Sequence, residues 1–206
     1  HDLWDRRRDD VDYLSFRVGV GDQVALVSAE IEAGGLEDLR DFGEKKLRRS
    51  DPIHLSPLVV SLPNHGAIGL VGDRKYTLGV LQWIMLQTIS LHSHRDVSLC
   101  GALPTSFAED FEYLKWLPHV RYGGAEVDEP TFAFGEVKSV VLFQKIRALI
   151  ESRNAKSTHG YSNDKVIPPS VVFIVDETVV RDRTSIDAIL KTGPAVGVYT
   201  IFLSSQ

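Results

Sequence analysis

The stretch that decides the fold is Ala67-Ile68-Gly69-Leu70-Val71-Gly72-Asp73-Arg74-Lys75-Tyr76-Thr77, which passes directly from an apolar run into a helical pattern. Residues 67–72 predict a buried strand because they form a short, almost continuous apolar run. Residues 78–91 continue as a largely apolar helix. A strand that turns at once into a helix is typical of a parallel sheet covered by helices, so this stretch predicts an α/β fold.

The turn in this stretch has part of the pattern of a phosphate-binding loop. A working loop needs two glycines separated by four residues and followed by Lys and Ser or Thr, so that backbone N–H groups surround the phosphates. Gly72 corresponds to the first glycine, and Lys75 and Thr77 correspond to the Lys and the hydroxyl. The second glycine is missing, the turn is too short, and Tyr76 separates the Lys from the hydroxyl. The sequence therefore predicts a degenerate loop.

A second apolar run, Val171-Val172-Phe173-Ile174-Val175-Asp176-Glu177, predicts a buried strand that ends in an acidic pair. In a competent nucleotide site Asp176 would hold Mg²⁺ and Glu177 would polarise the attacking water, while Lys75 and Thr77 would contact phosphate and metal. The alternative interpretation is a strand end that meets solvent.

Asp73 opposes turnover at such a site. It places a negative charge where a polyphosphate would lie, an unfavourable term of about 1–4 kcal/mol at ~4 Å, depending on the local dielectric. Without the second glycine, the backbone N–H groups cannot all converge on a phosphate. Nucleotide binding without hydrolysis stays open, because helix N-termini attract anions.

Composition limits the remaining possibilities. With 206 residues and 43% hydrophobic content, the chain is long enough for one sizeable core. The net charge of −5 and the absence of a long basic run argue against a nucleic-acid partner. The lone Cys100 lies in an apolar run, which indicates a core residue and a reducing compartment. No apolar run has the roughly 18–20 residues of a membrane helix, no signal peptide is present, and the seven histidines have no metal-binding spacing.

We expect two parts along the chain. Residues 1–62 form a β-rich segment, with a hairpin of strands 14–20 and 24–31 around Gly21-Asp22, an amphipathic helix 36–47, a connector between Pro52 and Pro57, and a strand 58–62. Residues 63–206 alternate strands with helices and predict a three-layer sheet domain. Its expected strands are 67–72, 97–103, 171–175 and 197–203, its helices 76–92, 108–115, 136–152 and 184–191, and its polar loop 154–165.

Three segments carry a family resemblance. The first is Trp4-Asp5-Arg6-Arg7 with Asp10-Val11-Asp12-Tyr13-Leu14-Ser15-Phe16-Arg17-Val18-Gly19-Val20-Gly21, and the second is Phe111-Glu112-Tyr113-Leu114-Lys115-Trp116-Leu117-Pro118-His119. The third runs from Gly193 to Gln206 and resembles the strand of FtsK/SpoIIIE translocases that leads to a sensor Thr-Gln. Together the segments resemble the EccC/EssC membrane ATPases of type VII secretion.

The resemblance implies a RecA/FtsK-like, P-loop NTPase-like parallel sheet. In that family the corresponding block is a degenerate ATPase-like domain between the transmembrane helices and the first of several ATPase domains. It implies vestigial nucleotide-binding residues, namely Gly72, Lys75, Thr77, Asp176 and Gln206. Asp176 would bind Mg²⁺ only with nucleotide, no cofactor is expected although ATP with Mg²⁺ remains possible, and Glu177 would be the catalytic residue only if the domain were active.

The function expected from this resemblance is a stalk or coupling domain of a type VII secretion translocase ATPase, on the cytoplasmic side of the cell membrane. Implied partners are the following ATPase domains and other subunits of the membrane complex, with a hexamer in the full assembly and a monomer for the isolated domain. The alternative is a weak Mg-ATPase that uses Asp176 and Glu177. DNA translocation is disfavoured by the acidic balance.

Aromatic and basic side chains of the first two segments are candidates for contacts with partners. Trp4, Arg6 and Arg7 could form a docking strap or simply lead into a strand, and Tyr113 and Trp116 could form a contact patch or pack internally.

Overall fold

The computed structural model describes residues 3–24, 36–48, 53–120, 131–158, 169–181 and 183–205. These residues divide into two compact units, which are described separately. One unit comprises the described residues up to Phe16 and from Ser61 onward, and the other is Arg17–Val60. Sequence alone placed the boundary at residue 62 and grouped the first residues with the β-rich segment.

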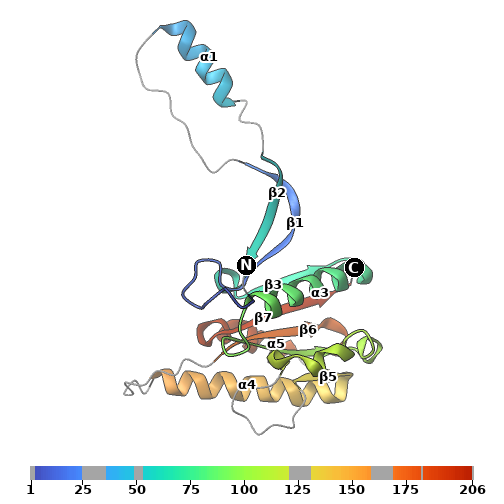
Figure 1. Cartoon of the computed structure of the whole chain (residues 1–206). Helices are drawn as coiled ribbons and strands as arrows, with labels where there is room; N and C mark the ends of the chain where they lie inside the picture. Colours follow the sequence, from blue (N-terminus) through green and yellow to red (C-terminus); the bar gives the residue numbers. More distant parts are fainter. Residues whose placement is uncertain are drawn as a thin grey trace. The chain divides into compact units, whose positions relative to one another are not determined.

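The larger unit is built on a five-stranded parallel sheet (Figure 1). Its strands are β3 (Ala67–Val71), β4 (Val97–Leu103), β5 (Phe132–Phe134), β6 (Ser170–Asp176) and β7 (Val198–Ser204), in the spatial order β3-β7-β6-β4-β5. Every adjacent pair is parallel. The four predicted strands and their arrangement in one sheet are confirmed. Sequence missed β5, because three residues are too few to give a periodic pattern.

Both faces of this sheet are covered. All seven residues of β4 and of β6 are buried, so these strands form the centre of the domain. Val171, Phe173 and Val175 pack in one apolar cluster with residues of α4 (Glu136–Thr158) and α5 (Arg183–Thr192). Val172 and Ile174 point to the opposite face and are equally buried. Such continuous apolar strands are typical of parallel sheets with helices on both sides.

Helix α3 (Arg74–Leu91) follows β3 after a turn of two residues and packs beside it (Figure 1). It buries a stripe formed by Thr77, Leu81, Ile84, Met85 and Thr88. The helix begins two residues before the predicted start, because Asp73 caps its first turn.

Short helical turns complete this unit. They are α2 (Leu62–His65) and the 3₁₀ turns Thr105–Phe107, Glu112–Trp116, Pro118–Val120, Glu177–Val179 and Pro194–Val196. The predicted helix 108–115 is wrong: non-helical turn residues and the 3₁₀ turn Glu112–Trp116 replace it. The predicted loop 154–165 is also wrong at its start, because α4 continues to Thr158; residues 159–165 lie outside the described part of the chain.

Residues 3–16, here called the N-terminal strap, pack against the C-terminal end of α3. Backbone N–H groups of Trp4 and Arg6 donate to the carbonyls of Ser90 and Leu91, each at 3.0 Å. The Nε1–H of Trp4 donates to the carbonyl of Ile89 at 3.0 Å. These bonds use carbonyls near the end of the helix, which have few partners within it.

The smaller unit contains the helix α1 (Glu37–Arg48) and most of a two-stranded antiparallel sheet, whose strands are β1 (Ser15–Gln23) and β2 (Ile53–Ser61). The helix is confirmed. The predicted turn at Gly21-Asp22 is wrong, because β1 runs through both residues and pairs with β2. Pro57 lies within β2 rather than ending a connector, a position open to proline in an edge strand. The predicted return strand 24–31 lies almost entirely outside the described residues.

Candidate functional site

The candidate site lies where β3, β6 and β7 end, at one edge of the sheet. Val71 is paired with Ser204 and Asp176 with Leu203, so the carboxyl ends of these strands are in register. The start of α3 and the residues after β6 and β7 meet at this edge. In open α/β sheets, ligands bind outside the carboxyl ends of the strands.

The central contact of the site joins Arg74 to Asp176. Two guanidinium nitrogens of Arg74 donate to the carboxylate, Nη1 to Oδ2 at 2.5 Å and Nη2 to Oδ1 at 3.2 Å. The backbone N–H and hydroxyl of Thr178 donate to Oδ1 at 3.0 and 2.6 Å. Asp176 is fully buried, and its carboxylate thus has four donors from the chain itself. Charge-assisted pairs of this bidentate kind are among the strongest polar contacts in proteins.

The Arg74 guanidinium also makes a cation–π contact with Phe107. Its carbon lies 5.5 Å from the centre of the Phe107 ring, which is largely buried. Such a cation over an aromatic face is stabilising, and it fixes the direction of the Arg74 side chain.

The N-terminus of α3 is occupied by a carboxylate of the chain. Asp73 Oδ1 accepts a hydrogen bond from Lys75 N at 2.9 Å, and the Asp73 carbonyl accepts from Tyr76 N and Thr77 N at 3.1 and 3.0 Å. Gly72 has φ +147°, which favours glycine, and its N–H donates to Ser204 O at 3.2 Å. The N–H groups from 72 to 77 that could face a phosphate are therefore largely used internally.

Thr77 and Lys75, the two other residues of the phosphate-loop pattern, lie in different environments. The Thr77 hydroxyl is buried and donates to the carbonyl of Arg74 at 3.1 Å, so it supports the first turn of the helix. Lys75 is exposed and has no ion-pair partner among the described residues. The structure thus brings Gly72, Thr77 and Asp176 to one place but leaves the Lys75 ammonium in solvent.

Glu177 is tied to the end of β7. Its carboxylate accepts from the Ser204 hydroxyl at 2.6 Å, from Ser205 N at 2.5 Å and from the Ser205 hydroxyl at 2.8 Å. These hydrogen bonds lower the pKa of Glu177 to about 2. A carboxylate with so low a pKa is a poor proton acceptor at neutral pH, which weakens the case for a general base.

Sequence reasoning missed Arg74, Ser204 and Ser205 as members of the site. Arg74 was part of the stretch that predicted the loop, but nothing in the sequence paired it with an acid 102 residues away. Gln206, the predicted sensor residue, lies outside the described residues.

The candidate contact residues fall into two groups. Trp4 and Arg6 both make contacts within the chain. The Trp4 indole donates to the carbonyl of Ile89 near the end of α3, and Arg6 forms an ion pair with Asp12 at 2.8 Å. Arg7 is mostly exposed and lies 3.5 Å from Asp96. Tyr113 and Trp116 are exposed, at 41% and 79%, while the neighbouring Phe111 is buried. Exposed aromatic side chains are enriched at protein interfaces, so the patch of Tyr113 and Trp116 remains available to a partner.

No group of three or more His, Cys, Asp or Glu side chains in the described ranges could hold a metal ion. No helix in the described part of the chain is long and apolar enough to cross a membrane.

Comparison with known proteins gives the context of this site. No protein-family model matches the chain. It is 24% identical over 209 residues to the ESX secretion system protein EccC of Geobacillus thermodenitrificans, covering 98% of this chain. It is 30% identical to EccC of Thermomonospora curvata over 57% of this chain, and 22% identical to the type VII secretion system protein EssC of Staphylococcus aureus over 93%. The chain spans 14%, 9% and 13% of these proteins.

Solved structures show the same fold. EssC (ATPases 2 and 3) from Geobacillus thermodenitrificans aligns with 100% of this chain and 36% of its own, at a TM-score of 0.60 and 12% identity. Thermomonospora curvata EccC (ATPases 2 and 3), in complex with a signal sequence peptide, aligns with 73% of this chain and 27% of its own, at a TM-score of 0.52 and 16% identity. The chain thus shares its fold with these EccC and EssC ATPase domains. The chain is a homologue of the EccC and EssC proteins of type VII secretion.

Proposed function

We propose that the chain is a coupling domain of a longer type VII secretion translocase ATPase, and that it passes on conformational change without efficient ATP hydrolysis. The observation that carries this proposal is the Arg74–Asp176 pair. A cation of the chain occupies the carboxylate that would otherwise hold Mg²⁺. Magnesium would have to displace Arg74 from this carboxylate first.

The internal partners of the other site residues support the same proposal. Asp73 takes the helix N-terminus that would attract a phosphate, and Ser204 and Ser205 hold the carboxylate of Glu177. Asp176, Glu177 and the N-terminus of α3 are thus satisfied by neighbours in the fold, whereas the Lys75 ammonium stays exposed. A site stabilised in this way keeps the ATPase architecture without a vacant place for the reactants.

Helix α3 provides a physical route for coupling. Its first residue, Arg74, holds Asp176, and its last turn accepts hydrogen bonds from the N-terminal strap. The helix has 18 residues and therefore spans roughly 27 Å. Because a packed helix moves largely as a rigid body, a pull on the strap would change the position of Arg74.

The proposed setting follows from the homologues. The domain would lie on the cytoplasmic side of the membrane, within a chain whose further ATPase domains are its first partners. Other subunits of the secretion complex would contact it in a hexameric assembly. The exposed patch of Tyr113 and Trp116 is suited to one of these contacts.

Hydrogen–deuterium exchange tests the coupling directly. Trp4→Ala removes the indole that anchors the strap to Ile89, and Trp116→Ala is a matched control on an exposed indole. We expect Trp4→Ala to accelerate exchange in residues 4–16 and also at the first turn of α3, around Lys75–Thr77. Acceleration confined to the strap and the adjoining end of α3 would contradict coupling through the helix.

A second function, weak Mg-ATP binding, has one observation in its favour. The Lys75 ammonium is exposed near the strand ends and without an ion-pair partner among the described residues, so it could contact a phosphate. Replacing Lys75 by Ala would then weaken binding, whereas the coupling proposal predicts no nucleotide-dependent difference between the variant and the parent chain.

A further inference from the structure

The exposed face of α3 carries large apolar side chains and no charge. Tyr76, Trp83 and Leu86 are 71%, 45% and 49% exposed. No charged residue occurs in the helix after Lys75. The opposite face is the buried stripe that packs on the sheet, so the helix is apolar on both sides. A helix of this composition is usually buried all round, which indicates a partner for its exposed face.

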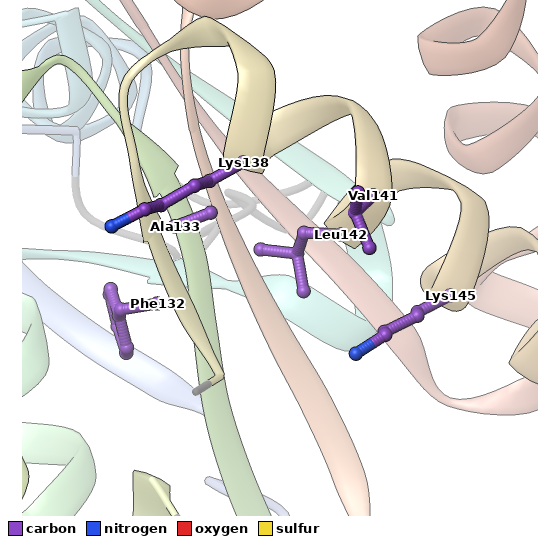
Figure 2. Close-up of a pocket in the computed structure, with 6 residues that line it drawn as sticks. All are labelled: Phe132, Ala133, Lys138, Val141, Leu142 and Lys145. Atoms are coloured by element: carbon purple, nitrogen blue, oxygen red, sulfur yellow. The ribbon is translucent and has the colours of Figure 1, made fainter. Parts of the chain in front are cut away.

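Helix α4 has the more usual pattern of a surface helix. Next to a hollow of about 260 Å³ beside β5, the exposed Val141 lies between Lys138 and Lys145 along the helix (Figure 2). Figure 2 shows the two lysines on either side of Leu142. Charged side chains interspersed with apolar ones in this way keep a surface in water. The exposed face of α3 lacks them from its second turn onward.

The exposed residues of α3 form one narrow stripe. Tyr76, Gly79, Trp83 and Leu86 follow one another at steps of three, four and three residues, and all four are exposed. Steps of three and four residues return to the same side of an α-helix. Their alternation is the spacing of the seam along which two helices pack against each other.

Gly79 makes a notch in the middle of this stripe. A glycine inside a helix is destabilising relative to alanine, so its presence calls for a packing reason. A Cβ atom added at Gly79 would have no other atom within 4 Å. No contact in the described part of the chain therefore requires a residue without a side chain here. The notch suits the close approach of a large side chain from another molecule.

The stripe is complementary to itself. When a second copy of α3 lies antiparallel, with a twofold axis at the level of residue 81, Trp83 of each copy faces the Gly79 notch of the other. Tyr76 of each copy then faces Leu86 of the other, because both pairs of positions are centred on residue 81. In a twofold interface every such contact occurs twice.

Charge also favours the antiparallel arrangement. It places the N-terminus of each α3 beside the C-terminus of the other, so the two helix dipoles attract each other. The exposed Lys75, in the first turn, then lies beside the last turn of the other helix. A cation is stabilising near a helix C-terminus, where the carbonyl groups carry partial negative charge.

We propose that α3 is a self-association surface, through which two copies of this chain pair with their α3 helices antiparallel and Trp83 of each copy over Gly79 of the other. This pairing goes beyond the proposed coupling function and does not depend on whether the strand-end site binds nucleotide. A single pair of helices is a small interface, so we expect weak association, with a dissociation constant between micromolar and millimolar. The chain is then a monomer when dilute and a dimer when concentrated.

Sedimentation equilibrium of the 206-residue chain, from about 10 μM to about 1 mM, tests this proposal. We expect a reversible equilibrium between monomer and dimer. Trp83→Ala should weaken the dimer at least about tenfold, because central aromatic residues supply most of the binding energy of an interface. Trp116→Ala, a matched change of an exposed indole outside the stripe, should leave the dissociation constant within about twofold.

Gly79→Leu separates specific pairing from non-specific apolar association. Leucine is a better helix former than glycine and has room at this position in a single chain, so thermal unfolding in dilute solution should move to a higher temperature. The added side chain fills the notch, and the dimer should weaken at least about tenfold. Non-specific association of apolar surfaces would instead become stronger.

Mixing two variants tests the antiparallel register. Tyr76→Lys and Leu86→Glu should each weaken the dimer when measured alone, whereas an equimolar mixture should recover association. The new lysine of one variant faces the new glutamate of the other only when the helices are antiparallel. A chain that stays monomeric up to about 1 mM, equal losses in Trp83→Ala and Trp116→Ala, a stronger dimer in Gly79→Leu, or a mixture that does not recover would overturn the proposal.

Discussion

The guanidinium of Arg74 donates two hydrogen bonds to the carboxylate of Asp176. Arg74 is the first residue of α3, and Asp176 is the last residue of β6. In the proposed function, this pair takes up the carboxylate that would otherwise hold the metal of a nucleotide. It also joins the helix that contacts the N-terminal strap to the central strand of the sheet. The predictions below follow from this arrangement.

Removing Arg74 should destabilise the domain. Arg74→Ala leaves the buried Asp176 carboxylate without its cation, and we expect a loss of about 2–3 kcal/mol, below the value for a fully buried pair because Arg74 is partly exposed. Arg95→Ala, which removes an exposed arginine, should change little. Urea unfolding measures both. The double change Arg74→Met with Asp176→Leu should recover most of the loss, and failure of Arg74→Ala to lower stability would contradict the structural role of the pair.

Glu177 makes stability depend on pH in the acidic range. Its pKa is lowered from 4.5 to about 2 by hydrogen bonds from Ser204 and Ser205, so its contribution is complete above 4.5 and lost as pH falls toward 2. The stability difference between the parent chain and Glu177→Gln should therefore shrink over this range. Chemical unfolding at a series of pH values measures it. A difference independent of pH would show that the carboxylate is not held in this way.

His92 should make the free energy of unfolding depend on pH in a higher range than Glu177 does. Burial lowers its pKa from 6.5 to about 4, and its neutral Nε2 accepts the backbone N–H of Leu14 at 3.1 Å. The unfolded chain takes up the proton first, so the free energy of unfolding should fall as pH drops from 6.5 to 4. His92→Gln should show a weaker decline over this interval. NMR titration of the imidazole would contradict the account if its pKa were near 6.5.

Trp4 should stabilise the domain by anchoring the N-terminal strap to α3. This indole donates to Ile89 and packs edge-on against His94, at a centroid distance of 5.3 Å. Trp4→Ala should cost about 2–3 kcal/mol, less than for a fully buried tryptophan because Trp4 is partly exposed. Trp116→Ala, at the exposed patch, should cost less than about 0.5 kcal/mol. Thermal unfolding of the two variants compares them, and equal losses would contradict the anchoring role of Trp4.

Local patterns were sufficient for most of the sheet. β4 and β6 are continuous apolar runs, and their alternation with helices indicates parallel strands from the sequence alone. β5 has only three residues and depends on its pairing with β4, so no local pattern marks it. The predicted hairpin around Gly21-Asp22 is wrong because glycine and aspartate also occur within strands. The strand that pairs with β1 is β2, which begins 30 residues after β1 ends.

The positions of the strand ends were predictable, but the contacts of the candidate site were not. The short turn after β3 and the acidic pair at the end of β6 marked the ends of these strands, because both signals are local. The pairing of Arg74 with Asp176 depends on how β3 and β6 are placed on either side of β7, which the sequence does not state. The same holds for His92, which ends a helix in the sequence but receives a hydrogen bond from Leu14 in the structure.

The most direct test of the central claim is calorimetric titration of the purified chain with Mg-ATP. The account predicts no binding heat for the parent chain at millimolar nucleotide, because Arg74 occupies Asp176 and Asp73 occupies the helix N-terminus. A saturable binding isotherm for the parent chain that disappears in Asp176→Ala would contradict the claim, since it would show that the carboxylate still holds a metal-bound nucleotide.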